Sequence, residues 1–180
     1  MANEGMQIFL DSNITRLQQN YMEWVDKLGD MRPAFKLFIP EFKESREGWI
    51  RSGRTVDGLK FAPLSPLYAD AKMRKYGRRL ILVASGRLLK ATQGGPGWKQ
   101  AIGMKSLELG LTLNYASYLQ DGTTLKDGTT KMPQRNFWIT KNGTLTKMDY
   151  AQLLQAMEGQ IDILSKSMLN KSLATLAGEK

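Results

Sequence analysis

The residues best suited to chemistry in this chain are cations, and they are concentrated between residues 60 and 91. They are Lys72, Arg74, Lys75, Arg78, Arg79, Arg87 and Lys90. The first five fall within eight consecutive positions, and Asp70 is the only acid in the segment. Cations at a helix end gain only about 0.3–1 kcal/mol each from the helix dipole, which does not explain such a cluster. The pattern favours contact with a polyanion, usually nucleic acid, or with an acidic neighbouring subunit.

The positive charge of the chain comes from its middle third. Residues 51–105 carry twelve Lys or Arg and two Asp or Glu. The corresponding numbers are six and eight in residues 1–50, and eight and seven in residues 106–180. The net charge of +9 therefore lies almost entirely in the segment that holds the cation cluster. A solvated surface, or pairing with acids of another subunit, stays open as an alternative to polyanion binding.

Composition argues against an enzyme. The chain has no histidine and no cysteine, which removes the commonest general base, thiolate catalysis and the commonest metal ligands. Catalysis by carboxylates or lysine stays open, but the acids are scattered along the chain. The "GGPGWK" stretch lacks the spacing of a phosphate-binding loop, and no histidine is present to activate Ser85. We therefore expect no catalytic residue, no metal and no cofactor.

Hydrophobic periodicity predicts an α+β fold, with a small antiparallel β-sheet packed with several helices. Long amphipathic helices are expected at both ends of the chain. The predicted helices cover residues 6–28, 33–50, 67–76, 86–91 and 148–176, and paired strands are predicted within 98–113. Pro40 predicts a kink or break in the second helix, and Ser65 followed by Pro66 predicts the start of the third. A short strand or turn is expected at 80–83, and "FWIT" predicts a strand before a turn at 141–143.

These elements predict a single domain over residues 1–180. It consists of a helical N-terminal region (1–50), an α+β core (51–140) and a C-terminal helix (141–180). No segment has the pattern of a signal peptide or a membrane span, so we expect a protein made in the cytoplasm. The repeated Asp-Gly-Thr-Thr of residues 121–132 predicts a mobile loop, or one that becomes ordered against a partner. The candidate interface residues of that loop are Asp121, Gly122, Lys126, Asp127 and Gly128.

Four sequence blocks in the core carry a resemblance to a known family. They are "DGLKFAPLSPLYADAK" (57–72), "LILVASGRLLKA" (80–91), "NYASYLQDG" (114–122) and "MPQRNFW" (132–138). In this order they resemble the phage virion morphogenesis proteins, the tail-completion family that includes the Mu-like protein G group. The chain departs from the family pattern at Tyr118 and Leu119, where relatives commonly carry a histidine, and at Gln134, where relatives have a small residue.

The resemblance implies a structural protein of the virion. Such a subunit completes the tail or neck at the head–tail joint of a tailed phage, in a ring around the channel through which DNA leaves. Implied partners are other copies of the chain, in a ring expected to be six-fold, and neighbouring neck, connector or tail proteins. Non-specific contact with genomic DNA is also expected, and membrane contact is not. The cations would then face the channel or an acidic neighbour.

The resemblance also sets expectations for packing. Five side chains are expected to be buried in the folded core of the subunit: Phe61, Leu64, Tyr68, Leu82 and Leu88. Gly86 is expected to allow close approach or a positive φ.

Two other functions stay open on the sequence. One is a free DNA-binding regulator that uses residues 65–91, with Arg87, Lys90 and Thr92 on a recognition helix. The other is a tail-assembly chaperone that leaves the finished particle.

Overall fold

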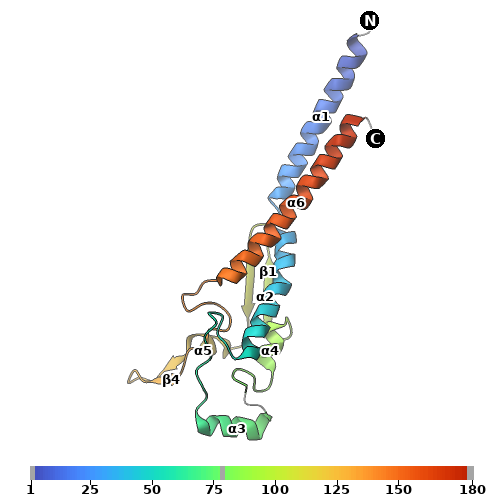
Figure 1. Cartoon of the computed structure of the whole chain (residues 1–180). Coiled ribbons are helices and arrows are strands. Elements are labelled where there is room, and N and C mark those ends of the chain that lie inside the picture. Colours follow the sequence, from blue (N-terminus) through green and yellow to red (C-terminus); the bar gives the residue numbers. More distant parts are fainter. Residues whose placement is uncertain (1–2, 78–79, 178–180) are drawn as a thin grey trace. The chain divides into compact units, whose positions relative to one another are not determined.

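The computed structural model describes the backbone of residues 3–77 and 80–177, and the side chains of residues 14–77 and 80–177. The helices are α1 (Asn3–Leu28), α2 (Arg32–Ser52), α3 (Pro66–Tyr76), α4 (Arg87–Thr92), α5 (Ala116–Asp121) and α6 (Lys147–Ala177). The strands are β1 (Trp98–Ile102), β2 (Leu107–Leu111), β3 (Thr123–Thr124) and β4 (Thr130–Met132). They form two two-stranded sheets, β1–β2 and β3–β4 (Figure 1). The predicted α+β class, with long helices at both ends, is confirmed.

The structure departs from three local predictions. Of the kink or break predicted at Pro40, the break is wrong, because helix α2 is continuous from Arg32 to Ser52 with Pro40 exposed inside it, and the kink stays a prediction. Residues 137–139 form bends rather than a strand, because the Gln120 side chain rather than a neighbouring strand binds their backbone. The supposed loop at 121–132 contains the β3–β4 hairpin, whose antiparallel register pairs Thr123 with Met132. The turn at 141–143 is confirmed, and residues 80–83 form a turn.

The chain divides into two compact units. Unit 1 comprises Met1–Lys36, Ile102–Ser106 and Leu153–Lys180, and unit 2 comprises Leu37–Ala101 and Leu107–Gln152. Helices α2 and α6 contribute residues to both units. The prediction that the chain folds as one domain stays a prediction.

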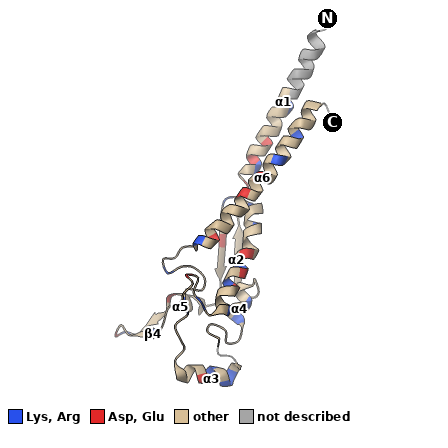
Figure 2. Ribbon diagram, in the orientation of Figure 1, with Lys and Arg blue, Asp and Glu red and all other residues tan. Residues whose placement is uncertain are grey.

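Unit 1 is built on a pair of helices. The Asn20 amide of α1 donates to the Thr175 hydroxyl of α6 across 3.1 Å. Glu23 of α1 accepts hydrogen bonds from Lys171 of α6 and from Lys27 of its own helix. Figure 2 colours the ribbon at the acidic and basic residues of both helices. These two lysines, Lys171 foremost, lower the pKa of the Glu23 carboxyl to about 2.

The core of unit 2 draws on elements far apart in the sequence. Its buried residues are Ile50, Phe61, Val83, Leu88, Ala116 and Phe137. Helix α2 supplies further buried side chains at Phe38, Ile39 and Phe42, a spacing that places them on one helical face. Trp138 packs edge-on against both Phe42 and Trp98, with ring centroids 5.1 Å and 5.7 Å away. Aromatic packing thus joins α2 to strand β1 through the 138 segment.

Of the five side chains expected in the core, Phe61 and Leu88 are buried as predicted. Leu64 and Leu82 are only partly buried, and Tyr68 is 54% exposed. Tyr68 is exposed because α3 packs on the rest of the unit through Lys72, its only buried side chain, rather than through an apolar stripe. Leu82, outside that helix, packs against the core without being fully covered. The positive φ expected at Gly86 is confirmed at 81°. No helix in the described part of the chain is long and apolar enough to cross a membrane.

The pair formed by Glu23 and Lys171 predicts acid sensitivity of unit 1. The pKa of Glu23 is about 2 in the folded chain against an ordinary 4.5, so the stabilisation is complete above pH 4.5 and is lost as the pH falls towards 2. We expect Glu23→Gln to lose less helicity than the parent chain between these two pH values. Circular dichroism during an acid titration at low salt measures this, with Glu158→Gln, at an exposed position of α6, as the control. Identical titration curves for parent and Glu23→Gln would contradict it.

Candidate functional site

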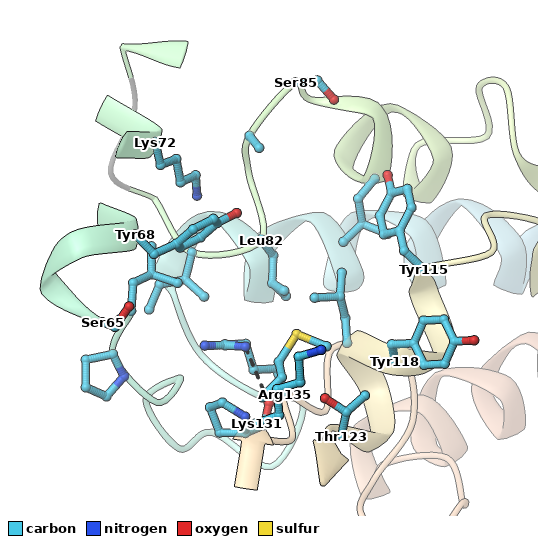
Figure 3. A pocket seen from close by; sticks show the side chains of 18 of the residues that line it. Ser65, Tyr68, Lys72, Leu82, Ser85, Tyr115, Tyr118, Thr123, Lys131 and Arg135 are labelled. Atoms are coloured by element: carbon cyan, nitrogen blue, oxygen red, sulfur yellow. Dashed lines mark hydrogen bonds between the residues drawn. The ribbon is translucent and has the colours of Figure 1, made fainter. Parts of the chain in front are cut away.

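Unit 2 contains a groove with a volume of about 1330 Å³. Its walls come from the segment that leads into α3, the turn before α4, helix α5 and the β3–β4 hairpin (Figure 3). The local sequence explains this arrangement. Ser65 and Pro66 start α3, and Gly77, with a φ of 63°, ends it in the left-handed conformation that glycine adopts without strain.

The four sequence blocks meet at this groove. Pro63 to Lys72 of the first block, Ile81 to Leu88 of the second, Tyr115 to Leu119 of the third and Met132 to Arg135 of the fourth contribute to its lining. Each block also supplies at least one residue of the buried core of unit 2. The blocks are therefore parts of one folded structure with the groove on it.

Backbone hydrogen bonds join the blocks directly. The amide of Val56, next to the first block, donates to the Asn136 carbonyl across 2.7 Å, and the Arg135 amide donates to the Leu119 carbonyl across 3.0 Å. Gly122 lies against the fourth block so closely that a Cβ there would be 2.7 Å from the Met132 carbonyl oxygen. With a φ of 76°, this position admits only glycine without strain. The fourth block thus lies between the first and the third.

The groove is lined mainly by apolar side chains, and its described charged side chains are all positive. Among its described lining residues, five are Lys or Arg and none is Asp or Glu: Lys72, Arg87, Lys126, Lys131 and Arg135. Three tyrosines also line it, Tyr68, Tyr115 and Tyr118, and each is more than a third exposed. A site of this composition has no carboxylate or thiol for acid–base or covalent chemistry, and it suits a negatively charged ligand.

Lys72 is a buried cation on the groove side of α3. This residue is 4% exposed, and its ammonium donates a hydrogen bond to the Leu80 carbonyl. Burial lowers its pKa, and the positive charge of Arg135 lowers it further. The two cations are therefore close enough to repel each other.

Arg135 is a second buried cation in the same groove. It is also 4% exposed, and burial lowers its pKa, with Tyr68 opposing the shift. Its terminal nitrogens reach the Ala62 and Pro133 carbonyls only at 3.4 Å, and its Nε has no hydrogen-bond partner. An arginine with unused donors in a buried position is rare, since buried polar groups are normally satisfied.

The structure separates the cations that the sequence grouped together. Lys72 and Arg87 line the groove, one buried and the other exposed. Arg74, Lys75 and Lys90 are exposed outside it, and Figure 2 shows the basic colour on α3. Arg78 and Arg79 lie outside the described residues. Whether any of these cations faces DNA or protein stays a prediction.

The predicted interface loop is the hairpin that forms one wall of the groove. Asp121 is exposed at the end of α5, and Lys126 lines the groove near the hairpin tip. The Asp127 carboxylate accepts from the Thr129 amide at 2.9 Å and from its hydroxyl at 2.7 Å. Gly128 next to it has a φ of 83°. These contacts give the tip a defined turn; its ordering at an interface stays a prediction.

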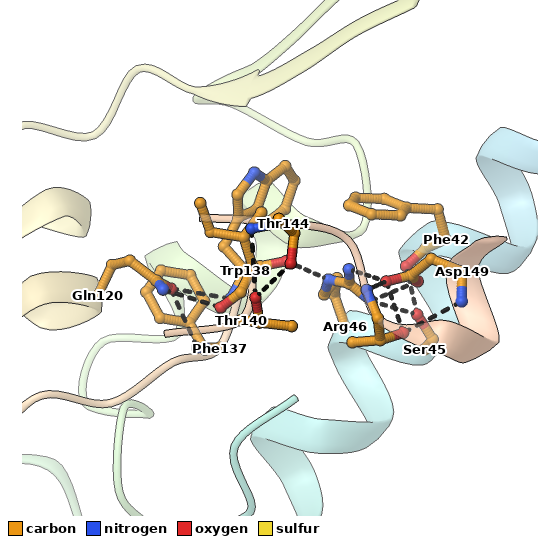
Figure 4. A network of polar contacts seen from close by, with 11 residues as sticks. Phe42, Ser45, Arg46, Gln120, Phe137, Trp138, Thr140, Thr144 and Asp149 are labelled. Carbon is orange, nitrogen blue, oxygen red and sulfur yellow. Dashed lines mark hydrogen bonds and ion pairs between the residues drawn. The ribbon is translucent and has the colours of Figure 1, made fainter. Parts of the chain in front are cut away.

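Gln120 holds the fourth block in place. Its amide donates to the Ile139 carbonyl across 2.9 Å, and its oxygen accepts from the Phe137 and Trp138 amides at 3.2 Å and 3.1 Å (Figure 4). One buried side chain therefore satisfies three backbone groups that would otherwise belong to a strand ladder. The next residues along the chain extend this network to α2 and α6.

The second part of this network is a fully buried ion pair. Arg46 of α2 binds both carboxylate oxygens of Asp149 in α6, at 2.9 Å and 2.7 Å, and donates to the Trp138 carbonyl at 2.6 Å (Figure 4). Both side chains are 0% exposed. Thr146 and Asp149 also bond each other reciprocally, side chain to backbone, as a capping box at the start of α6. Burial alone would raise the Asp149 pKa, but the hydrogen bonds and charge of Arg46 hold it below its usual range.

Sequence reasoning missed several groove residues: Tyr115, Tyr118, Lys131 and Arg135. Arg135 left a signal, because it is a charge set beside Phe137 and Trp138 in a segment that reads as core. Tyr115 and Tyr118 left none, because the residue type alone does not show which exposed aromatic side chain lines a groove. The Thr146-x-x-Asp149 spacing is the sequence signature of a capping box, and it could have placed the start of α6.

In the described part of the chain, no three Asp, Glu, His or Cys side chains come together as metal ligands would. Comparison with protein-family models, with curated proteins and with solved structures gives no match for this chain.

Replacing Gln120 tests its positioning role. Gln120→Ala leaves the Phe137 and Trp138 amides without a protein acceptor, so we expect a loss of about 2–4 kcal/mol in the free energy of unfolding. Urea denaturation followed by tryptophan fluorescence measures it. Gln155→Ala, at an exposed position of α6, is the matched control and should change stability by less than about 0.5 kcal/mol. Equal stabilities of the two variants would show that Gln120 does not hold the segment.

Removing one partner of the buried ion pair should be more damaging. Arg46→Met leaves the Asp149 carboxylate buried without its counter-charge, which costs about 3–5 kcal/mol. The matched control is Arg51→Met, which breaks the exposed pair with Glu47 on the same helix and should cost less than about 1 kcal/mol. Urea denaturation at neutral pH compares the two, and similar midpoints would contradict the role given to Arg46.

Proposed function

We propose that this chain is a non-enzymatic structural protein of a tailed bacteriophage, a tail-completion or neck subunit that acts in a ring around the DNA exit channel. The observation that carries the proposal is the convergence of the four family-like blocks. They lie up to about 80 residues apart in the sequence, yet they share one buried core and line one groove. A set of motifs that belongs to one family fold requires such convergence, so it supports the resemblance that the four blocks carry.

A ring requires contact surfaces, and unit 1 offers one. Its helices expose many large apolar side chains among the described residues. On α1 they are Ile14, Tyr21, Met22 and Val25, and on α6 they are Leu154, Ile161, Ile163, Leu169, Leu173 and Leu176. Apolar surface of this extent on two neighbouring helices is typical of an interaction site. It supports the proposal that copies of the chain, or the chain and its neck or tail neighbours, associate in the virion.

Contact with DNA in the proposed ring would involve phosphates only. Arg74 and Lys75 are exposed and available for this purpose. The alternative function, a sequence-specific regulator, is less well supported, because α4 has six residues and Thr92 of its expected recognition face is fully buried. A helix that exposes only Arg87 and Lys90 has too few side chains to read bases.

Mass photometry of the purified chain tests the proposal, at low and high salt and with and without random-sequence duplex DNA. We expect a ring-sized species, or a monomer that enters rings when phage tails are added. Leu169→Glu should abolish this assembly by placing a charge on the apolar surface of α6. Ser167→Glu, at an exposed polar position of the same helix, should leave it intact.

Binding of DNA should not depend on sequence and should weaken as salt rises, because the contacts release counterions. A stable dimer that shifts one particular DNA sequence and ignores random duplex would overturn the proposal and favour the regulator.

A further inference from the structure

The floor of the groove contains two buried cations without a counter-charge. Lys72 and Arg135 are each 4% exposed, and no Asp or Glu stands among the described residues of the lining. A buried charge is costly unless it is paired, and a folded chain normally supplies the partner itself. Arg46 shows that this chain does so elsewhere, since its guanidinium is matched by Asp149.

The donors of both cations are only partly used. The Nε of Arg135 has no partner, and its two other contacts, both at 3.4 Å, are longer than well-formed hydrogen bonds. Lys72 has three donor hydrogens, of which the Leu80 carbonyl takes one. A guanidinium fork fits the two oxygens of a carboxylate, and the neighbouring ammonium adds a second positive charge. This donor set points to an anionic group of the size of a carboxylate.

The other side chains that line the groove indicate which further chemical groups its ligand carries. Aliphatic side chains cover much of the groove: Leu64, Ile81, Leu82, Leu88, Leu119 and Leu125. Lys126 and Lys131, on the hairpin, add exposed positive charge at its edge. The ligand must therefore carry apolar side chains and more than one negative charge.

We propose that the groove binds an extended, acidic and apolar peptide segment of a neighbouring protein, with one carboxylate of the segment against the side chains of Lys72 and Arg135 (Figure 3). The inference goes beyond the proposed ring and does not depend on it. A chain that forms no ring can still bind such a segment, and a ring can form without it.

Two other occupants fit less well. Duplex DNA is a stiff rod with its phosphates on the outside, so its charges do not reach two side chains that are 4% exposed. A single carboxylate side chain is small and flexible, so it can approach them from within the groove that they line. Within this chain, no described Asp or Glu lines the groove, and Glu23 and Glu47 pair with Lys171 and Arg51 elsewhere. A separate protein is therefore the better source of the carboxylate.

Fluorescence anisotropy with a labelled peptide of alternating leucine and glutamate tests the proposal. The matched probe replaces every glutamate with glutamine. We expect the acidic peptide to bind and the glutamine peptide to fail. Lys72→Gln and Arg135→Gln should each weaken binding roughly tenfold to hundredfold, the value of one charge-assisted hydrogen bond. Arg74→Gln and Lys75→Gln remove the same charge at exposed positions outside the groove and should leave the affinity within about twofold of the parent.

If the groove variants do not fold, lysine methylation of the parent chain measures peptide binding independently of them. The acidic peptide should protect Lys126 and Lys131 from the reagent and leave Lys75 as reactive as before. Three results would overturn the proposal: equal binding of both peptides, no protection of the groove lysines, or groove variants that fold and bind with unchanged affinity. Protection of the same lysines by random duplex DNA, without binding of the peptide, would assign the groove to nucleic acid instead.

Discussion

The order of unit 2 depends on one buried ion pair. Arg46 donates hydrogen bonds to both carboxylate oxygens of Asp149 and to the Trp138 carbonyl. A single guanidinium therefore joins α2, the start of α6 and the segment around Trp138. A fully desolvated pair is stable only when every remaining donor and acceptor is satisfied, which makes its geometry exacting. Thr146 and Phe42 complete that geometry, one by capping and the other by lying 4.0 Å below the guanidinium. The segment carrying Arg135 is then held between this pair and Gln120.

The groove in the same unit differs from this ion pair, because its buried cations have no carboxylate partner among the described lining residues. Lys72 and Arg135 are desolvated beside each other with no counter-charge among the described residues, and both have lowered pKa values in consequence. At the same wall, Leu82 has a φ of 65°, a conformation that costs a residue other than glycine about 1–2 kcal/mol. A fold that satisfies Arg46 so completely could satisfy Arg135 equally well. Local cost of this kind concentrates at binding sites, where a ligand recovers it.

The sequence predicted what local periodicity encodes and missed what distant contacts decide. The long helices, the start of α3 at Ser65 and the φ of Gly86 follow from spacing and from residue type, and they are confirmed. Of the kink or break predicted at Pro40, the break does not occur, because buried side chains of α2 hold the helix on both sides of that residue. Residues 137–140 were predicted to form a strand because the local sequence does not show that the Gln120 side chain accepts the hydrogen bonds of the Phe137 and Trp138 amides. At the site, the sequence shows the cations but not which of them are buried, because Lys72 and Arg135 belong to segments that come together only in the folded chain.

The two surfaces proposed for this chain obey different physics. The apolar surface of unit 1 associates through the hydrophobic effect, which added salt does not weaken and which kosmotropic salts strengthen. The groove of unit 2 attracts its ligand through charge at its edge, which salt screens over about 10 Å at 0.1 M ionic strength. Its buried cations are screened less than Lys126 or Lys131, so salt should slow the encounter more than it loosens the seated carboxylate. A chain built in this way can assemble under conditions in which its groove is still empty, and the two events can therefore follow one another in time.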